Sequence, residues 1–253
     1  FILKIEKASD SLKHSLIDAV KALHPEHVFK ISDDKSQQCA LLLKEYLTEG
    51  GNIFTTNYDI LLYWVLMRNK VSNAIDGFGR EVEQLSYNVE EIEWSELIWG
   101  PNKSKQNVHY IHGALPLFDA GPRVIKEEYN GNYILENINK RVANKQYPIF
   151  VTAGNAEEKL SHILHNQYLT HCYDKLTNIT GSLVTFGFNF GEYDDHIIEA
   201  INLASSFNDE RNGKLFSIYI GVYNDNDEKH INKIKHKFKC KVNLFDAKTV
   251  KFW

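Results

Sequence analysis

The sequence predicts an α/β protein: a doubly wound, Rossmann-like parallel sheet with helices on both faces and a small helical insertion. Two observations predict this fold class. Short apolar segments alternate along the chain with segments whose apolar residues recur at helical spacing. The short segments are apolar on both sides, as strands covered on both faces are, and they run into glycine-bearing or polar turns.

The first half supplies the opening elements of this alternation. Apolar residues recur at helical spacing over 9–23 and again over 34–49, where Gly50-Gly51 ends the predicted helix. A short apolar strand over 52–56 then runs directly into an apolar helix over 59–68.

Two stretches interrupt the alternation. We expect residues 70–107 to form a small insertion that is helical around 89–99, because the segment holds acidic pairs together with Trp94 and Trp99. Residues 116–147 also lack a strand pattern, and only their last part, 132–144, predicts a helix.

The remaining strands are short apolar runs, at 108–111, 148–152, 182–186, 214–220 and 241–245. Three further helices are expected: one begins after Gly154, one spans 192–206 and one spans 228–238. The helix after Gly154 begins with Asn155 and has Glu158 three residues later, which predicts a capping box.

Length and composition indicate one globular domain over residues 1–253. The chain is 43% hydrophobic and 25% charged, and its formal net charge of −4 gives no electrostatic reason to expect nucleic acid as a partner. The lysines between Lys233 and Lys241 recur every second residue, which spreads their charge around a helix instead of along one face. The longest apolar run, Ile60–Met67, is far shorter than the roughly 20 residues of a membrane span.

Cysteine usage favours a reducing cytoplasm. The three cysteines, Cys39, Cys172 and Cys240, are odd in number and far apart, so neither a disulfide framework nor a cysteine zinc site is expected. His162 and His165 lie three residues apart on a predicted helix, but no carboxylate is spaced to complete a metal site. We therefore expect a cytoplasmic protein with no zinc and no other metal.

Candidate functional residues follow the predicted strands directly. In open parallel sheets, ligands bind beyond the carboxyl ends of the strands, and helix N-termini there suit phosphate groups. Four polar or glycine-bearing turns occupy such positions, at residues 55–59, 112–113, 152–155 and 187–191. This arrangement predicts a nucleotide ligand.

The amino-acid sequence of these turns resembles that of the sirtuin family. In sirtuins a Thr-Gln-Asn-Ile-Asp strand end and a later His-Gly turn flank the nicotinamide ribose of NAD. The sequence is similar in more detail to bacterial, zinc-free sirtuin-like domains. Five pieces occur in the same order here, over roughly residues 50 to 200: Thr55–Asp59, Asp76–Phe78, His112–Leu115, Glu157–Leu160 and Gly187–Ile197.

The resemblance implies a role for each matching residue. It makes Asn57 and His112 the catalytic residues, with the Asn57 amide orienting the ribose or a water and His112 accepting a proton. We expect both side chains to be exposed, so that their loss leaves folding nearly intact. The residues that it implies for binding NAD are Thr55, Thr56, Asp59, Gly113, Gly187, Asn189 and Asp194.

Ordinary structural roles remain open for several of these residues. Asp59 either orients a ribose hydroxyl or caps the following helix. Asp194 and Asp195 both suit the first turn of a helix, where they stabilise its dipole, and the resemblance leaves a ribose contact open for Asp194. Lys159 either reaches a phosphate or lies in solvent, whereas Tyr58 is expected to pack in the core.

Two departures from the family pattern limit the resemblance. Sirtuins carry a Gly-Ala-Gly loop after their first strand, whereas the first glycines here are Gly50 and Gly51. Either the glycine-rich strand and turn lie upstream of Phe1, or the protein has lost this means of holding the pyrophosphate; the absence of a starting Met favours the first alternative. The four zinc-binding cysteines of deacylating sirtuins are also missing, which weakens the protein-deacylase interpretation.

The sequence therefore predicts an NAD glycohydrolase, which the resemblance places in bacterial antiviral defence with a protein trigger or a homo-oligomer as partner. A non-catalytic nucleotide-binding sensor or interaction domain is the alternative. An NAD-dependent protein deacylase is a weaker one.

Overall fold

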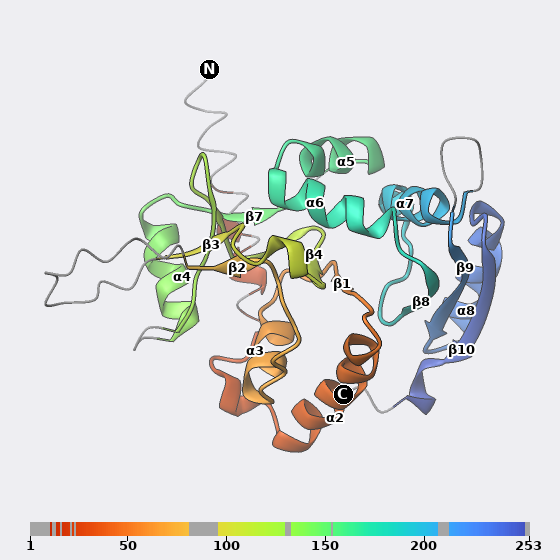
Figure 1. Cartoon of the computed structure of the whole chain (residues 1–253), viewed down its shortest axis with the longest axis horizontal. Coiled ribbons are helices and arrows are strands. Elements are labelled where there is room, and N and C mark those ends of the chain that lie inside the picture. Colours follow the sequence, from red (N-terminus) through yellow and green to blue (C-terminus); the bar gives the residue numbers. More distant parts are fainter. Residues whose placement is uncertain are drawn as a thin grey trace, which may run out of the picture. The chain divides into compact units, whose positions relative to one another are not determined.

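The computed structural model describes residues 11, 14–15, 17–20, 22, 24–80, 96–129, 133–152, 154–206 and 213–250 (Figure 1). The chain divides into two compact units. The first comprises Phe1–Phe150 with Phe252–Trp253, and the second comprises Val151–Lys251. The strands pair in both parallel and antiparallel fashion, which confirms the α/β class.

The first unit contains a parallel two-stranded sheet. Its strands are β1 (Ile53–Thr55) and β4 (Val108–Tyr110), aligned so that Thr55 lies opposite Tyr110. Helix α3 (Leu61–Arg68) follows β1 after a short turn, as the sequence predicts. Helix α2 (Asp33–Thr48) precedes β1 and buries a stripe at helical spacing, made by Cys39, Ala40, Leu43 and Leu47. Shorter 3-10 turns are η1 (Val28–Lys30) and η2 (Lys103–Lys105).

The other sheet of the first unit has five strands, and their pairing is antiparallel throughout. In spatial order the strands are β2 (Phe78–Gly79), β3 (Leu97–Trp99), β6 (Val124–Lys126), β5 (Gly113–Asp119) and β7 (Pro148–Phe150). The expected strand at 148–152 is therefore present, but it does not pair in parallel. Helix α4 (Ile134–Ala143) confirms the helix expected at 132–144.

This sheet corrects two expectations. The insertion at 70–107 was expected to be helical around 89–99, but Leu97–Trp99 form a strand; residues 89–95 lie outside the described residues. The stretch from 116 onward holds most of β5 and all of β6. Both strands are buried on both faces, so their apolar runs lack the alternation that marks a strand. Pro116 within β5 also argued against a strand by sequence alone.

One hydrophobic core joins this sheet to the helices of the first unit. Its fully buried side chains come from the start of α3, from β5 and from α4: Ile60, Leu115 and Ile138 each have 0% of their surface exposed. Trp64 and Phe118 pack in the same cluster. The core therefore fixes the start of α3 against the five-stranded sheet.

The second unit contains a parallel three-stranded sheet in the order β10-β9-β8 (Figure 1). Its strands are β8 (Gly181–Thr185), β9 (Leu215–Val222) and β10 (Lys241–Asp246), close to the three expected. Helices α7 (Asp195–Ser205) and α8 (Asp225–Ile234) connect them, and both contact β9. The 3-10 turns are η3 (Glu192–Asp194), η4 (Lys235–Lys237) and η5 (Ala247–Thr249).

Two further helices open the second unit, α5 (Ala156–Leu164) and α6 (Gln167–Leu176). The capping box predicted for the first of them is confirmed. The Asn155 side chain accepts a hydrogen bond from the Glu158 N–H, and the Glu158 carboxylate accepts one from the Asn155 N–H. Among the described residues, none of the helices has both the length and the hydropathy needed to cross a bilayer.

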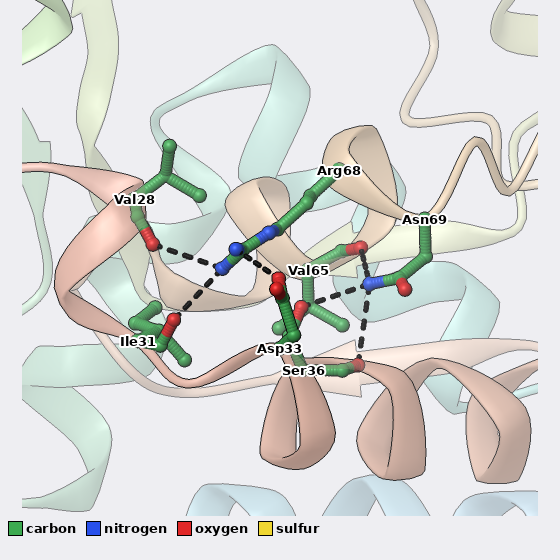
Figure 2. Close-up of polar contacts among 7 residues, drawn as sticks. All are labelled: Val28, Ile31, Asp33, Ser36, Val65, Arg68 and Asn69. Atoms are coloured by element: carbon green, nitrogen blue, oxygen red, sulfur yellow. Dashed lines mark hydrogen bonds and ion pairs between the residues drawn. The ribbon is translucent and has the colours of Figure 1, made fainter.

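Polar side chains join the C-terminal end of α3 to the segment that opens α2 (Figure 2). The Arg68 guanidinium donates to the carbonyls of Val28, at 3.2 Å, and Ile31, at 2.8 Å, and pairs with the Asp33 carboxylate. Asn69 donates to the carbonyl and hydroxyl oxygens of Ser36. These contacts hold two segments that lie more than 30 residues apart in the sequence.

We expect Arg68→Lys to lower the free energy of unfolding by about 1–2 kcal/mol, because one ammonium group cannot reproduce the fork that reaches two carbonyls and a carboxylate. Urea denaturation measures the change. Lys35→Ala, an exposed substitution on α2, is the control and should change stability by less than about 0.5 kcal/mol. Equal effects of the two substitutions would show that the Arg68 contacts contribute nothing.

Candidate functional site

The carboxyl ends of β1 and β4 lie side by side. The Ile53 N–H donates to the Asn107 carbonyl at 2.8 Å, and the Ile111 N–H donates to the Thr55 carbonyl at 2.9 Å. Because the two strands are parallel and in register, the turns that follow them begin at the same edge. The structure thus brings together the Thr55–Asp59 and His112–Gly113 turns.

Hydrogen bonds fix the shape of the turn after β1. The Thr55 hydroxyl accepts from the Asn57 N–H at 3.1 Å, and the Asp59 carboxylate accepts from the Leu61 N–H at 2.8 Å. The Leu115 N–H donates to the Tyr58 carbonyl at 2.7 Å, which ties this turn to β5. Asp59 therefore satisfies the first amide of α3, although the N-cap residue of this helix is Ile60. The Asn57 side chain is exposed and Thr56 is half-buried.

His112 does not lie exposed at the strand end as expected. Only 4% of its surface is accessible, and its ring lies 6.5 Å from the ring of Tyr58, measured between centroids. Tyr58 in turn packs against Phe150, at 4.9 Å between centroids. The expected exposure is therefore wrong for His112 and confirmed for Asn57, and the effect of either loss on folding stays a prediction.

Gly113 is required by the fold itself. Its φ of +80° lies in the left-handed region, and a Cβ atom added to it would lie 1.9 Å from the Ile149 carbonyl oxygen. The absence of a side chain thus allows β5 to approach β7 closely. Whatever Gly113 does for a ligand, this packing accounts for a glycine at the position.

In the second unit, three proposed binding residues lie in the loop between β8 and α7. Gly187 and Asn189 are exposed, and Gly187 has a φ of +64°. Phe190 also has a positive φ, 51°, although it is not a glycine, and its ring is buried against Phe238 at 5.2 Å between centroids. A non-glycine residue in this region is strained and persists only where its surroundings hold it.

The acidic residues at the end of this loop are engaged in ion pairs. Asp194 pairs with Lys159 at 2.8 Å, and both side chains are mostly buried. Asp195 pairs with Lys237 at 2.8 Å through both carboxylate oxygens. Lys159 is therefore bound to a carboxylate and not left in solvent, and Asp194 joins the start of α7 to α5.

Residues 4–253 match a family described as a domain of unknown function, DUF4917. The chain belongs to the DUF4917 family. No curated protein matches it.

The DUF4917 chain also contains a buried polar network that sequence reasoning missed. Trp99 donates to the Gln106 side-chain oxygen at 2.9 Å, and the Gln106 amide group donates to the Val108 carbonyl and to His109 Nδ1. The other ring nitrogen of His109 lies 3.1 Å from the Asn52 side-chain oxygen. Since His109 has 0% of its surface exposed, this network holds β4 against β1 from within. In the sequence, the one sign of this network is His109, a polar residue inside an otherwise apolar strand.

His196 lies in the Gly187–Ile197 piece, and the resemblance gives it no role. It lies in the first turn of α7, has 0% of its surface exposed, and accepts a hydrogen bond from the Tyr173 hydroxyl at its carbonyl oxygen. Burial lowers the pKa of His196 to about 4, against the opposing effect of Asp194; Lys159 lowers the pKa further. The DUF4917 chain therefore holds this imidazole neutral at pH 7.

This pKa predicts acid sensitivity. The pKa of His196 lies near 4 in the folded protein and near 6.5 when unfolded, so the unfolded state binds more protons below pH 6.5. The contribution of the neutral His196 ring to the free energy of unfolding is thus fully present above pH 6.5. It decreases as the pH falls, by on the order of 3 kcal/mol at pH 4. Thermal denaturation of His196→Gln should show a flatter pH dependence over this range. The exposed His162→Gln is the control and should keep the wild-type slope.

Proposed function

We propose that this DUF4917 protein binds NAD at the carboxyl ends of β1 and β4 and hydrolyses the bond between nicotinamide and ribose. The products are nicotinamide and ADP-ribose, with one water consumed and one proton released. The observation that carries the proposal is that the turns bearing Asn57 and His112 follow adjacent, parallel, in-register strands. This is the position at which open α/β sheets bind nucleotides.

The reaction requires the protein to orient the ribose and the attacking water and to supply one proton acceptor. Departure of nicotinamide leaves positive charge on the ribose ring, which fixed dipoles stabilise. The exposed Asn57 amide can hold a ribose hydroxyl or the attacking water without adding a charge of its own. The His112 imidazole, on the neighbouring strand end, takes the proton that the water or the hydroxyl gives up.

The other proposed residues shape the site or contact the nucleotide. Thr55 and Asp59 fix the turn that presents Asn57, through the hydrogen bonds to the Asn57 and Leu61 amides. Gly113 allows the chain to leave His112 and enter β5.

The loop after β8, in the second unit, also has the features of a nucleotide-binding turn. Gly187 and Asn189 are exposed beyond the carboxyl end of a parallel strand, which favours them as nucleotide contacts. Asp194 in the same loop can accept from a ribose hydroxyl in addition to its pairing with Lys159.

We also propose that the fold is of the doubly wound, Rossmann-like kind predicted from the sequence. Both parallel sheets contain β-strands followed by helices, namely β1 with α3 and β8 with α7, as in Rossmann-like nucleotide-binding folds. The likeness of the turn sequences to zinc-free sirtuin-like domains supports NAD as the nucleotide. The same likeness supports a cytoplasmic role in bacterial antiviral defence under a protein trigger.

Chromatographic quantification of nicotinamide tests the proposal. Purified protein mixed with NAD should release nicotinamide and ADP-ribose in equal amounts, with no need for an acylated peptide. Release that requires an acyl-lysine peptide would instead identify a deacylase. Saturable NAD binding without release would favour the sensor or interaction domain, and absence of binding would overturn the proposal.

A further inference from the structure

A histidine from the N-terminal segment holds the end of the turn that carries Asn57. His24 Nε2 lies 3.2 Å from the Ile60 backbone nitrogen, and His24 Nδ1 lies 2.8 Å from the Pro25 carbonyl oxygen. A backbone N–H can only donate and a carbonyl can only accept. The contacts therefore require a neutral ring whose proton is on Nδ1 and whose Nε2 accepts.

Ile60 is where the turn becomes helix. Its side chain is fully buried, its carbonyl accepts from the Trp64 N–H at 2.9 Å, and it directly follows Asp59. The His24 ring also packs edge-on against the Trp64 ring, at 4.7 Å between centroids. One imidazole thus satisfies a buried N–H at the start of α3 and packs against the next turn of the helix.

We propose that His24 is a positioning residue for the Asn57 turn, and that its neutral ring makes the geometry of this turn dependent on pH. Protonation places a proton on Nε2, which can then no longer accept from Ile60. The buried N–H loses its partner, and the segment from Thr55 to Ile60 is released at its helical end. This inference deepens the proposed function, on which its consequence for NAD rests.

The surroundings of His24 define the direction of the effect. The Trp64 ring and the Ile60 amide face it from α3, and Asp59 acts on it from the end of the turn. Burial is the strongest influence and lowers the pKa of His24 below 6.5, whereas the Pro25 carbonyl and Asp59 oppose it. At pH 7 the ring is therefore neutral, and the contact is lost as the pH falls from 6.5 through the lowered pKa.

NMR of the imidazole nitrogens and of amide exchange tests the contact directly. We expect the proton on Nδ1 of His24 at pH 7, and a protection factor at the Ile60 amide that falls by about tenfold or more on acidification to pH 5. A proton on Nε2 at pH 7, or protection at Ile60 that does not change with pH, would overturn the inference.

Two variants separate positioning from simple packing. His24→Gln places an amide oxygen near the position of Nε2, so it should restore protection at Ile60 and abolish its pH dependence. His24→Phe keeps a ring against Trp64 but has no acceptor, so protection at Ile60 should stay low at every pH. His14→Gln, at an exposed histidine, is the control and should behave as wild type. Low protection in both His24 variants would indicate packing alone.

NAD turnover supplies the second measurement. His24→Gln should keep the wild-type rate at pH 7 within about threefold and lose less activity at pH 5, and His24→Phe should lose activity at both. If the wild type releases no nicotinamide at all, the proposed function fails, yet protection at Ile60 still decides the His24 contact. If turnover is present but indifferent to both variants, the positioning role is refuted and the proposed function stands.

Discussion

Asn57→Ala is expected to reduce NAD cleavage by about 100-fold or more while changing the free energy of unfolding by less than about 1 kcal/mol. The Asn57 side chain is exposed, and the turn is held by its backbone N–H through the Thr55 hydroxyl. Removing the amide therefore takes away the orienting group and leaves the fold in place. Nicotinamide release and urea denaturation of the same preparation give both quantities.

His112 requires a different substitution because it is buried. His112→Gln keeps polar atoms at the position but supplies no group that can take up a proton, so the loss of activity should again be about 100-fold. Tyr58→Ala is the structural control: it removes a ring packed against Phe150 and should lose stability and activity together. If Asn57→Ala cleaves NAD at the wild-type rate, Asn57 has no catalytic role.

Gly113→Ala is expected to destabilise the protein by more than about 4 kcal/mol, which is exceptional for the addition of one methyl group. The new Cβ atom would lie 1.9 Å from the Ile149 carbonyl oxygen, so β5 and β7 would have to separate. The positive φ of Gly113 adds about 1 kcal/mol of strain for an alanine.

Gly121→Ala is the matched control for this substitution. Gly121 has nearly the same φ, +77°, but a Cβ atom at this position would have no neighbour within 4 Å. It should therefore show only the backbone strain, about 1 kcal/mol, by chemical denaturation. Similar losses for the two variants would mean that the close approach of β5 to β7 is not what requires a glycine.

Local patterns in the sequence predicted the helices and the parallel strands well. Helix α2 was visible because its buried residues recur at helical spacing before Gly50-Gly51. Strands β1, β8 and β9 were visible because each is a short apolar run that ends at a turn. In these segments, local propensity and tertiary structure agree.

The five-stranded sheet could not be predicted in the same way. Its β5 and β6 are buried on both faces, β5 contains Pro116, and β3 is only three residues long. What makes Leu97–Trp99 a strand is pairing with Phe78–Gly79 and with β6, residues distant in the sequence. Such pairing overrides weak local preference and leaves no periodic pattern.

The candidate site was predictable in position but not in its supporting contacts. The rule that ligands bind at strand ends led to Asn57 and His112, whose turns lie at the edge of one parallel sheet. Burial of His24, His109 and His196 has no sequence signature, because a histidine in an apolar segment looks the same whether exposed or enclosed. These buried rings became visible only through their partners in space.

Titration with NAD, followed by NMR at single residues, tests the central claim most directly. The claim predicts that the Asn57 side-chain amide and the His112 ring resonances shift together and saturate with one equivalent of NAD. Exposed groups of the first unit outside these turns, such as the Gln37 side-chain amide on α2, should not respond. If NAD leaves Asn57 and His112 unchanged, or shifts only other residues, the ends of β1 and β4 are not the nucleotide site.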